Sequence, residues 1–447
     1  MKTHRILPVQ RSAGLTECSA LEIDLRFSYP GMLFFYAEQL DAERLRHALS
    51  RVLNDFSPFA GKLVVRSSSL QIEHGAAPAL FETAQRDKSL AQLTAELRSH
   101  GRCRELEPQI SILRLLLARE PMLLVRLTQL HDGSVLGIGW NHAVGDMHST
   151  MLLMRAWADA YAGRAHKKPI LVTERDAYMR SVLPNPLAVR PSARRARILP
   201  ALAQRFELIR PSVRVHTEYS NSELLALQRA LSSGGARSKM VSRNDALCAH
   251  VYTVLKRLSL TSRQTNLCLV VNFRKRIGLP DHIVGNMTSL VSQPVRKQYS
   301  ASRIAAGLRR KLNEYANTQV NYHPTSRVFY ACSRTSQRVR LVSRQFRAGS
   351  GDIFITNWDN FGAYDLAFDK ARPELFRPIV LGSAQLPQWF MIVYELPRGQ
   401  GLAVTVGLPK AVAKRWQSAE GQALLHTLPL EPVRCPEPQL ERELSVV

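Results

Sequence analysis

Residues 134–163 read SVLGIGWNHAVGDMHSTMLLMRAWADAYAG, and this stretch decides how the first half of the chain folds. The apolar run at 134–140 predicts a buried strand, and the apolar run at 151–163 predicts a buried helix closed by a glycine. A strand-like run at 123–128 comes before them, and an Asp-Gly pair in between is typical of a tight hairpin turn. The sequence therefore predicts a hairpin that leads through a short polar loop into a helix.

Strand and helix signals alternate on both sides of this segment. The run GMLFFYA at 31–37 predicts a strand, and Asp41 occupies an N-cap position before leucines at helical spacing. Residues 166–215 are rich in proline and arginine, with few periodic apolar positions, which favours a crossover linker. After the linker, the pattern predicts a helix at 242–258 and a buried strand at 267–273.

Composition limits the class of protein. The 447 residues are 45% hydrophobic and 22% charged, which is ordinary for a globular chain. No apolar run approaches the roughly 18–20 residues of a membrane helix, and residues 1–14 lack the apolar core of a signal peptide. The six cysteines lie far apart, without a CxxC pair. We therefore expect a soluble, cytoplasmic protein with free thiols and no membrane span.

The net charge narrows the choice of partner. Lys and Arg number 61 against 36 Asp and Glu, a formal net charge of +25. Because the excess is spread along the chain and no RRM or zinc-finger motif accompanies it, we expect no nucleic-acid partner. The same charge suits a polyanionic small molecule such as coenzyme A or a nucleotide.

The loop at 141–146 holds the first candidate for a catalytic group, His142. The pKa of an imidazole lies near neutrality, so a histidine at a strand end can take a proton from a hydroxyl or an amine. The alternative is a histidine satisfied in the core while Asp146 caps the next helix. His148 completes a His/Asp/His trio, but no second ligand cluster accompanies it, so no metal site is expected.

Five phrases, in order along nearly the whole chain, resemble motifs of the BAHD acyltransferases. NHAVGDMHS at 141–149 resembles their HHxxxDG motif, and FSPFAGKL at 56–63 is similar to FPPLAGRL. SRNDALCAHVYTVLKRL at 242–258 is similar to SSFEALAAHVWRA, and VNFRKRIGLPDHIVGN at 271–286 to VDxRxRxxPPLPxxYxGN. ITNWDNFGAYDLAFDKARP at 355–373 is similar to SWxRFPFYExDFGWGKP. By this resemblance the chain is identified as a member of that family of CoA-dependent HxxxD acyltransferases.

The resemblance implies an α/β fold with two similar chloramphenicol-acetyltransferase-like domains, each a mixed sheet flanked by helices. The N-terminal domain would span residues 1–165 and the C-terminal domain residues 216–447, joined by the crossover linker at 166–215. The active site would lie in a channel between the domains. Acyl-CoA and the acceptor would enter from opposite faces and meet at His142.

The resemblance also implies roles for individual residues. Asp146 would be structural, turned away from the cavity and paired with Arg274, because a buried acid without such a partner would be costly. Tyr36 would face the acceptor, with core packing as the alternative, and Thr356 and Trp358 would also bind the substrate. By its position before the helix at 242–258, and not by the resemblance, the basic stretch Arg237, Ser238 and Lys239 is expected to hold the CoA phosphates, with a solvated loop as the alternative.

The sequence departs from the family at the DFGWG motif, where AFDKA stands at 367–371. The acid of the motif is lost, but Asp365 and Asp369 lie two residues to either side, on the same face of an extended strand. We expect one of them, in the first place Asp369, to approach an arginine or a backbone amide and anchor this segment. In addition, Asn272 replaces the acid of the family's DxR motif.

These observations predict an acyltransferase of specialised metabolism that moves an acyl group from acyl-CoA to a hydroxyl or amine of a small molecule. His142 would act as the general base without an acyl-enzyme, acyl-CoA would be a co-substrate rather than a bound cofactor, and the enzyme would be a monomer. Two alternatives stay open. One is a condensation-type enzyme that uses an acyl-carrier-protein donor, and the other is an inactive homologue that binds a small molecule. The acyl chain and the acceptor are not specified by the sequence.

Overall fold

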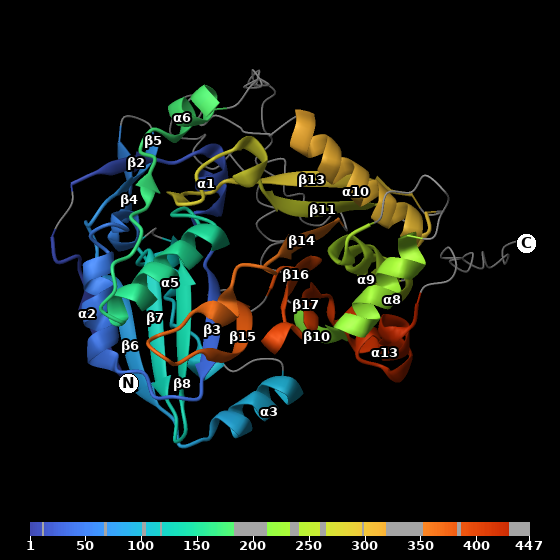
Figure 1. Ribbon diagram of the computed structural model, residues 1–447, viewed down its shortest axis with the longest axis horizontal. Helices are drawn as coiled ribbons and strands as arrows, with labels where there is room; N and C mark the ends of the chain where they lie inside the picture. Colours follow the sequence, from blue (N-terminus) through green and yellow to red (C-terminus); the bar gives the residue numbers. More distant parts are fainter. Residues whose placement is uncertain are drawn as a thin grey trace, which may run out of the picture.

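Two six-stranded mixed sheets, each covered by helices, make up the molecule (Figure 1). The α/β architecture with two sheet-containing halves is therefore confirmed. The computed structural model describes residues 1–10, 13–66, 69–100, 104–116, 119–182, 212–232, 241–259, 265–296, 299–318, 352–381 and 386–428.

The first sheet has the strand order β1-β6-β7-β8-β3-β15. β6 and β7 run parallel, and the other neighbours are antiparallel. Every residue of β3 and β8 is buried, which explains why both appear in the sequence as unbroken apolar runs. The strands are β1 (Lys2–Ile6), β6 (Ala79–Gln85), β7 (Leu123–Gln129), β8 (Ser134–Trp140), β3 (Pro30–Tyr36) and β15 (Pro373–Val380).

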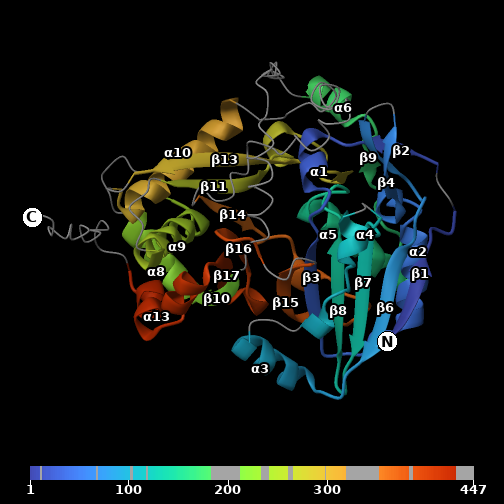
Figure 2. The same ribbon diagram turned by 180° about the vertical axis from the view of Figure 1, so that it is seen from behind.

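Helices cover both faces of the first sheet. α2 (Ala42–Val52) and α5 (Met147–Tyr161) pack together on one face, and α3 (Leu90–His100) and α4 (Ile112–Leu116) lie against the other face, seen from behind in Figure 2. The predicted cap of α2 is confirmed, because the Asp41 carboxylate accepts from the N–H groups of Glu43 (2.8 Å) and Arg44 (3.1 Å).

The second sheet has the strand order β10-β17-β16-β14-β11-β13. β16, β14 and β11 are parallel neighbours, and the remaining pairs are antiparallel. Its strands are β10 (Val213–Ser220), β17 (Gly401–Leu408), β16 (Phe390–Glu395), β14 (Ile353–Asn357), β11 (Thr265–Asn272) and β13 (Thr288–Val295). Its helices are α8 (Asn221–Ser232), α9 (Arg243–Ser259), α10 (Ala301–Thr318), α12 (Lys410–Trp416) and α13 (Ala419–His426).

Two strand pairings join distant parts of the sequence. β15 belongs to the C-terminal half of the sequence, yet it pairs with β3 at the edge of the first sheet. β9 (Ile170–Leu171), which lies in the segment expected to be a linker, pairs with β12 (Ile283–Val284) of the C-terminal half. The remaining elements are β2 (Leu15–Glu17), β4 (Lys62–Arg66), β5 (Ser69–Glu73), α1 (Ala20–Leu25) and α6 (Arg175–Val182).

Candidate active site

The loop between β8 and α5 is held by hydrogen bonds from several directions. The His142 N–H donates to the Ser28 carbonyl oxygen (2.9 Å), and Asn286 Nδ2 donates to the His142 carbonyl oxygen (2.8 Å). Within the loop, the Trp140 indole N–H donates to the Gly145 carbonyl oxygen (2.9 Å). The position of His142 is therefore set by the fold itself.

The His142 imidazole is half-buried and lines a cavity of about 200 Å³. Its Nδ1 is buried, so Nε2 is the ring nitrogen available to the cavity. Burial lowers the pKa of His142, while its own backbone carbonyl, the Asp146 charge and Asn286 oppose that shift. Because the pKa lies below its usual value, the imidazole is neutral at neutral pH, the form that can accept a proton.

Both halves of the chain contribute to this cavity at His142. Its wall is mostly apolar, with a few hydroxyl and amide groups, as is typical of small-molecule sites. From the N-terminal half the lining includes Leu21, Leu25, Ser28, Pro30, Trp140 and Met147, and from the C-terminal half Val270, Thr288, Ser289, Leu290, Thr356, Trp358, Phe390 and Ile392.

The expected ion pair between the Asp146 carboxylate and Arg274 is present. Asp146 is nevertheless among the residues that line the cavity with His142, so it is not fully turned away from it as expected. Arg274 Nη1 lies 2.7 Å from Oδ2 and Nη2 lies 3.1 Å from Oδ1. The Ser149 N–H (3.0 Å) and hydroxyl (2.9 Å) and the Met287 N–H (3.1 Å) also donate to this carboxylate. Burial would raise the pKa of Asp146, but Arg274 outweighs it, and the pKa lies below its usual value.

A second cavity, of about 490 Å³, adjoins the first, and His148, Asn272 and Phe361 line both. Its wall carries the basic side chains of Arg155 and Lys275, together with Arg274, Arg276 and the acid Asp281. The two cavities together form a space that combines an apolar part at His142 with a basic part.

Of the other expected site residues, some line the cavity and others do not. Thr356 and Trp358 line the cavity with His142, and the Trp358 ring packs on Trp140 with 6.2 Å between ring centroids. Tyr36 is fully buried in β3, its ring packs edge-on against Phe368 at 6.0 Å, and it is not among the residues that line the cavity. Its contacts therefore favour the alternative of core packing. The stretch Arg237, Ser238 and Lys239 lies outside the described residues.

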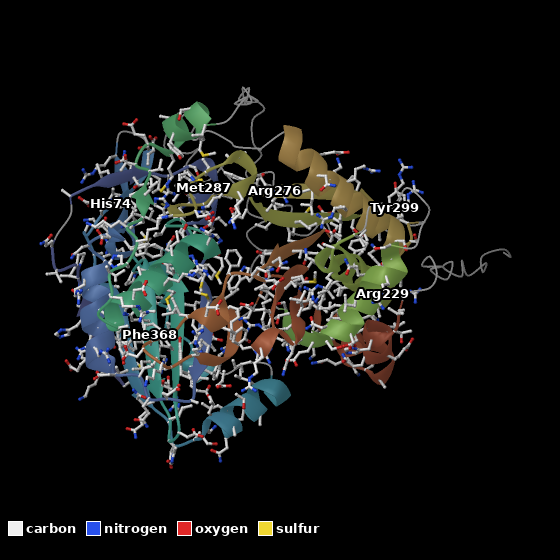
Figure 3. The ribbon with its side chains drawn as sticks, viewed as in Figure 1. His74, Arg229, Arg276, Met287, Tyr299 and Phe368 are labelled. Atoms are coloured by element: carbon white, nitrogen blue, oxygen red, sulfur yellow. The ribbon has the colours of Figure 1, made fainter. Side chains whose placement is uncertain are left out.

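The anchor expected at the altered DFGWG segment is confirmed. Arg44 binds Asp369 through two contacts, Nη1 to Oδ2 (2.6 Å) and Nη2 to Oδ1 (3.0 Å). Both side chains are 40% or more exposed, so this pair contributes at most about 1 kcal/mol. Phe368, labelled in Figure 3, is buried and packs edge-on against the rings of Trp157 and Tyr161. Packing of Phe368 is therefore the stronger attachment.

Sequence reasoning missed three polar residues beside the catalytic loop. Asn286, Glu22 and Arg175 are buried and hydrogen-bonded or ion-paired to one another or to the loop at 141–146. The only available signal was the VGN at the end of the segment 271–286, which resembles the family's YxGN.

Two features are absent from the described residues. In these parts of the chain, no three His, Cys, Asp or Glu side chains gather as a metal site would require. Over the same ranges, no helix combines the length and the apolar character needed to cross a bilayer.

The model of the Transferase family matches residues 23–419, which is most of the chain. A 128-residue segment is 34% identical to the BAHD acyltransferase DCR of Arabidopsis thaliana, and this match covers 27% of the chain but only 26% of that relative. The "Pelargonidin 3-O-(6-caffeoylglucoside) 5-O-(6-O-malonylglucoside) 4'''-malonyltransferase" of Salvia splendens is 22% identical, over 82% of this chain and 85% of the relative.

A solved structure shares the fold. F. sporotrichioides TRI101, complexed with coenzyme A and T-2, superposes with a TM-score of 0.68 at 16% identity, over 91% of this chain and 98% of that one. With the family match, the class is defined: the chain belongs to the Transferase family, that of the BAHD acyltransferases. It is an acyltransferase that uses acyl-CoA and a small-molecule acceptor.

Proposed function

We propose that His142 is the general base of a direct acyl transfer from acyl-CoA to a hydroxyl or amine of the acceptor. The observation that carries this proposal is a neutral imidazole whose buried Nδ1 leaves Nε2 to a cavity that both halves of the chain line. Coenzyme A in the TRI101 structure supports the same donor here, and the net charge of +25 suits its phosphates.

In the proposed reaction, His142 Nε2 takes the proton of the acceptor as its oxygen or nitrogen attacks the thioester carbonyl carbon. The tetrahedral oxyanion then collapses, the carbon–sulfur bond breaks, and the imidazolium returns the proton to the leaving thiolate. The products are the acylated acceptor and free CoA, so atoms and charge balance. The Thr356 hydroxyl, at the end of β14 in the cavity wall, is our candidate donor to the oxyanion.

No acyl-enzyme is needed in this sequence of steps. The cysteines that the structure describes, Cys18, Cys248 and Cys268, are buried. Burial raises the pKa of Cys268 to about 11 and that of Cys18 to about 12, so neither forms a thiolate readily. Both features support direct transfer over a cysteine-linked intermediate.

Asp146 is proposed to support the site rather than to share in proton transfer. Its carboxylate accepts hydrogen bonds from groups that fix the loop and from Arg274, and its lowered pKa keeps it ionised. The pair joins α5 to the segment after β11, so it ties the two halves of the chain together at the catalytic loop.

The test is product analysis with defined donors. The purified protein is incubated with a panel of alcohols and amines and, in separate reactions, with a pool of acyl-CoAs or with an acyl-carrier protein that bears the same acyl groups. Mass spectrometry identifies acylated acceptors and any acylated protein. We expect acylated acceptors, free CoA and no mass added to the protein. Acyl transfer only from an acyl-carrier protein would favour the condensation-type alternative, and transfer from neither donor would favour an inactive binding homologue.

We also propose that the enzyme is a cytoplasmic monomer of specialised metabolism. One chain supplies both sides of the catalytic cavity, so the site does not require a partner copy. The buried free thiols suit a reducing compartment. The Salvia relative, by its name, acts on a decorated pigment glycoside, which supports a similar metabolic setting. Light scattering on the purified protein would measure its molar mass and so test whether it is a monomer.

A further inference from the structure

The second cavity, of about 490 Å³, lies beside the cavity at His142 and is lined mostly by polar and charged side chains. His148, Asn272 and Phe361 line both spaces, so the two cavities meet at these residues. A volume of this size is in the range of small-molecule sites. A co-substrate whose reacting end lies at His142 can therefore extend into the second cavity.

Two segments beside the catalytic loop supply the cations of the second cavity. Arg155 lies on α5, the helix that follows the loop. Lys275 and Arg276 lie in the short 3-10 helix η3 (Lys275–Ile277), which follows β11. The ion pair between Asp146 and Arg274 joins these two segments, so it holds their cations around one space.

Among the described residues, carbonyl oxygens rather than carboxylates hold Arg155 and Arg276 in place. Arg155 Nη2 donates to the Phe361 carbonyl oxygen, and Arg276 Nη1 donates to the Leu312 carbonyl oxygen (3.0 Å). Because a carbonyl is uncharged and takes one of the five N–H donors of a guanidinium, charge and donors remain for a ligand. Lys275 is exposed, and its ammonium group has no hydrogen bond or ion pair with any residue that the structure describes.

The charge of this lining is positive. Arg274 is neutralised by its ion pair, and the one other carboxylate near it among the lining residues is that of Asp281. His148 Nε2 donates to the Asp281 carbonyl oxygen (2.6 Å), and burial, with the nearby charge of Arg274, lowers the pKa of His148, so this ring is neutral at neutral pH. The cations that remain against the single carboxylate are Arg155, Lys275 and Arg276. An excess of one sign of charge in a cavity raises the local concentration of an oppositely charged group.

We propose that the second cavity is an anion subsite, which binds a carboxylate or phosphate group of a co-substrate while the reacting end of the same molecule lies at His142. This inference rests on the proposed acyl transfer, because that reaction brings the co-substrate to His142. Guanidinium groups match carboxylate and phosphate oxygens in a two-point geometry, and a lysine adds a point charge. The anionic group can come from CoA, through its phosphates, or from an acid carried by the acceptor. In either case the site favours the charged molecule over its neutral analogue.

The test measures binding to the double variant Arg155→Gln with Lys275→Gln, which removes two charges and keeps polar side chains. Calorimetry compares wild type and variant with CoA, with 3′-dephospho-CoA, and with a panel of hydroxy acids and their methyl esters. We expect the Kd of at least one anionic ligand to rise about 10- to 100-fold in the variant, and this effect to shrink at high salt. The matched control is Lys410→Gln at the exposed start of α12, which should leave every Kd unchanged.

The ligands distinguish the two sources of the anionic group. A rise in the Kd of CoA assigns the subsite to the donor, and its persistence with 3′-dephospho-CoA identifies the diphosphate rather than the 3′-phosphate. A rise for a hydroxy acid, without a rise for its ester, assigns the subsite to the acceptor. Lys275→Gln alone replaces the double variant if the latter does not fold.

Two results would overturn the proposal. One is an unchanged Kd for CoA and for every hydroxy acid that wild type binds, in a variant with the melting temperature of wild type. The other is an equal loss of affinity for acids and esters with the Kd of CoA unchanged. Because calorimetry requires no turnover, a failure of wild type to transfer acyl groups would instead refute the proposed function.

Discussion

Removing the Asp146 carboxylate tests the structural role assigned to it. The change Asp146→Ala leaves Arg274, which is 1% exposed, without its ionic partner. It also leaves four further contacts incomplete: two from Ser149, one from the Met287 N–H and the second from Arg274. Breaking a buried pair by deleting one partner costs about 3–5 kcal/mol, so we expect that loss in the free energy of unfolding.

The assay is denaturant unfolding followed by tryptophan fluorescence, with turnover measured on the same preparations. The double variant Asp146→Ala with Arg274→Met should recover part of the lost stability, because the unpaired buried charge is gone. Asp159→Ala is the matched control, since it removes an Asp–Arg pair on the same helix at the surface, worth at most about 1 kcal/mol. An Asp146→Ala protein with unchanged stability and abolished turnover would refute the reasoning and favour a His–Asp catalytic dyad.

The ion pair between Asp146 and Arg274 makes the stability of the folded protein depend on pH. The pKa of Asp146 is lower in the folded protein than the value of about 3.9 for an unperturbed Asp. Its contribution is therefore fully present above pH 4 and is lost as the pH falls through the folded pKa. The difference in stability between wild type and Asp146→Ala should shrink below pH 4, and a difference that grows on acidification would contradict the assignment.

Three shorter predictions concern other parts of the site. Phe368→Ala should lower the free energy of unfolding by about 3–5 kcal/mol, because it leaves a cavity. Asp369→Ala and Asp365→Ala should each lower it by about 1 kcal/mol or less. A larger loss for Asp369→Ala than for Phe368→Ala would show that the ion pair dominates. Thr356→Val should lower kcat of acyl transfer by roughly 10- to 1,000-fold with stability retained, and an unchanged kcat would remove this hydroxyl as an oxyanion donor. Because burial lowers the pKa of His142, the acid limb of kcat/KM in wild type should lie below pH 6.5, and a limb above that value would contradict the burial seen here.

The elements that the sequence predicted correctly have local causes. The β7–β8 hairpin follows from two apolar runs around an Asp-Gly turn, and α2 begins at its predicted N-cap. β15 was missed because its sequence, PELFRPIV, has two prolines and two charged residues, and its partner β3 lies more than 300 residues earlier. A strand at the edge of a sheet can contain prolines and charged residues, so the local sequence of β15 did not predict a strand.

The site was predictable only in part for the same reason. His142, Asp146 and Arg274 belong to motifs with a fixed spacing, and the contact between the last two was implied by the resemblance to the family, in keeping with the need of a buried acid for a partner. The position of Tyr36 in the core depends on Phe368 reaching it from the far end of the chain. Asn286 ends a stretch that resembles a family motif, but its contacts with Glu22 and His142, in two other segments, could not be predicted from that stretch.

The most direct test of the account is thiol release from acyl-CoA by wild type and His142→Ala, measured in the presence of an acceptor that wild type acylates. Acceptor-dependent release should fall by about two to four orders of magnitude in the variant. Calorimetry should show that the variant still binds CoA and unfolds at the same temperature. Equal acceptor-dependent release by the two proteins would contradict the assignment of His142 as the general base.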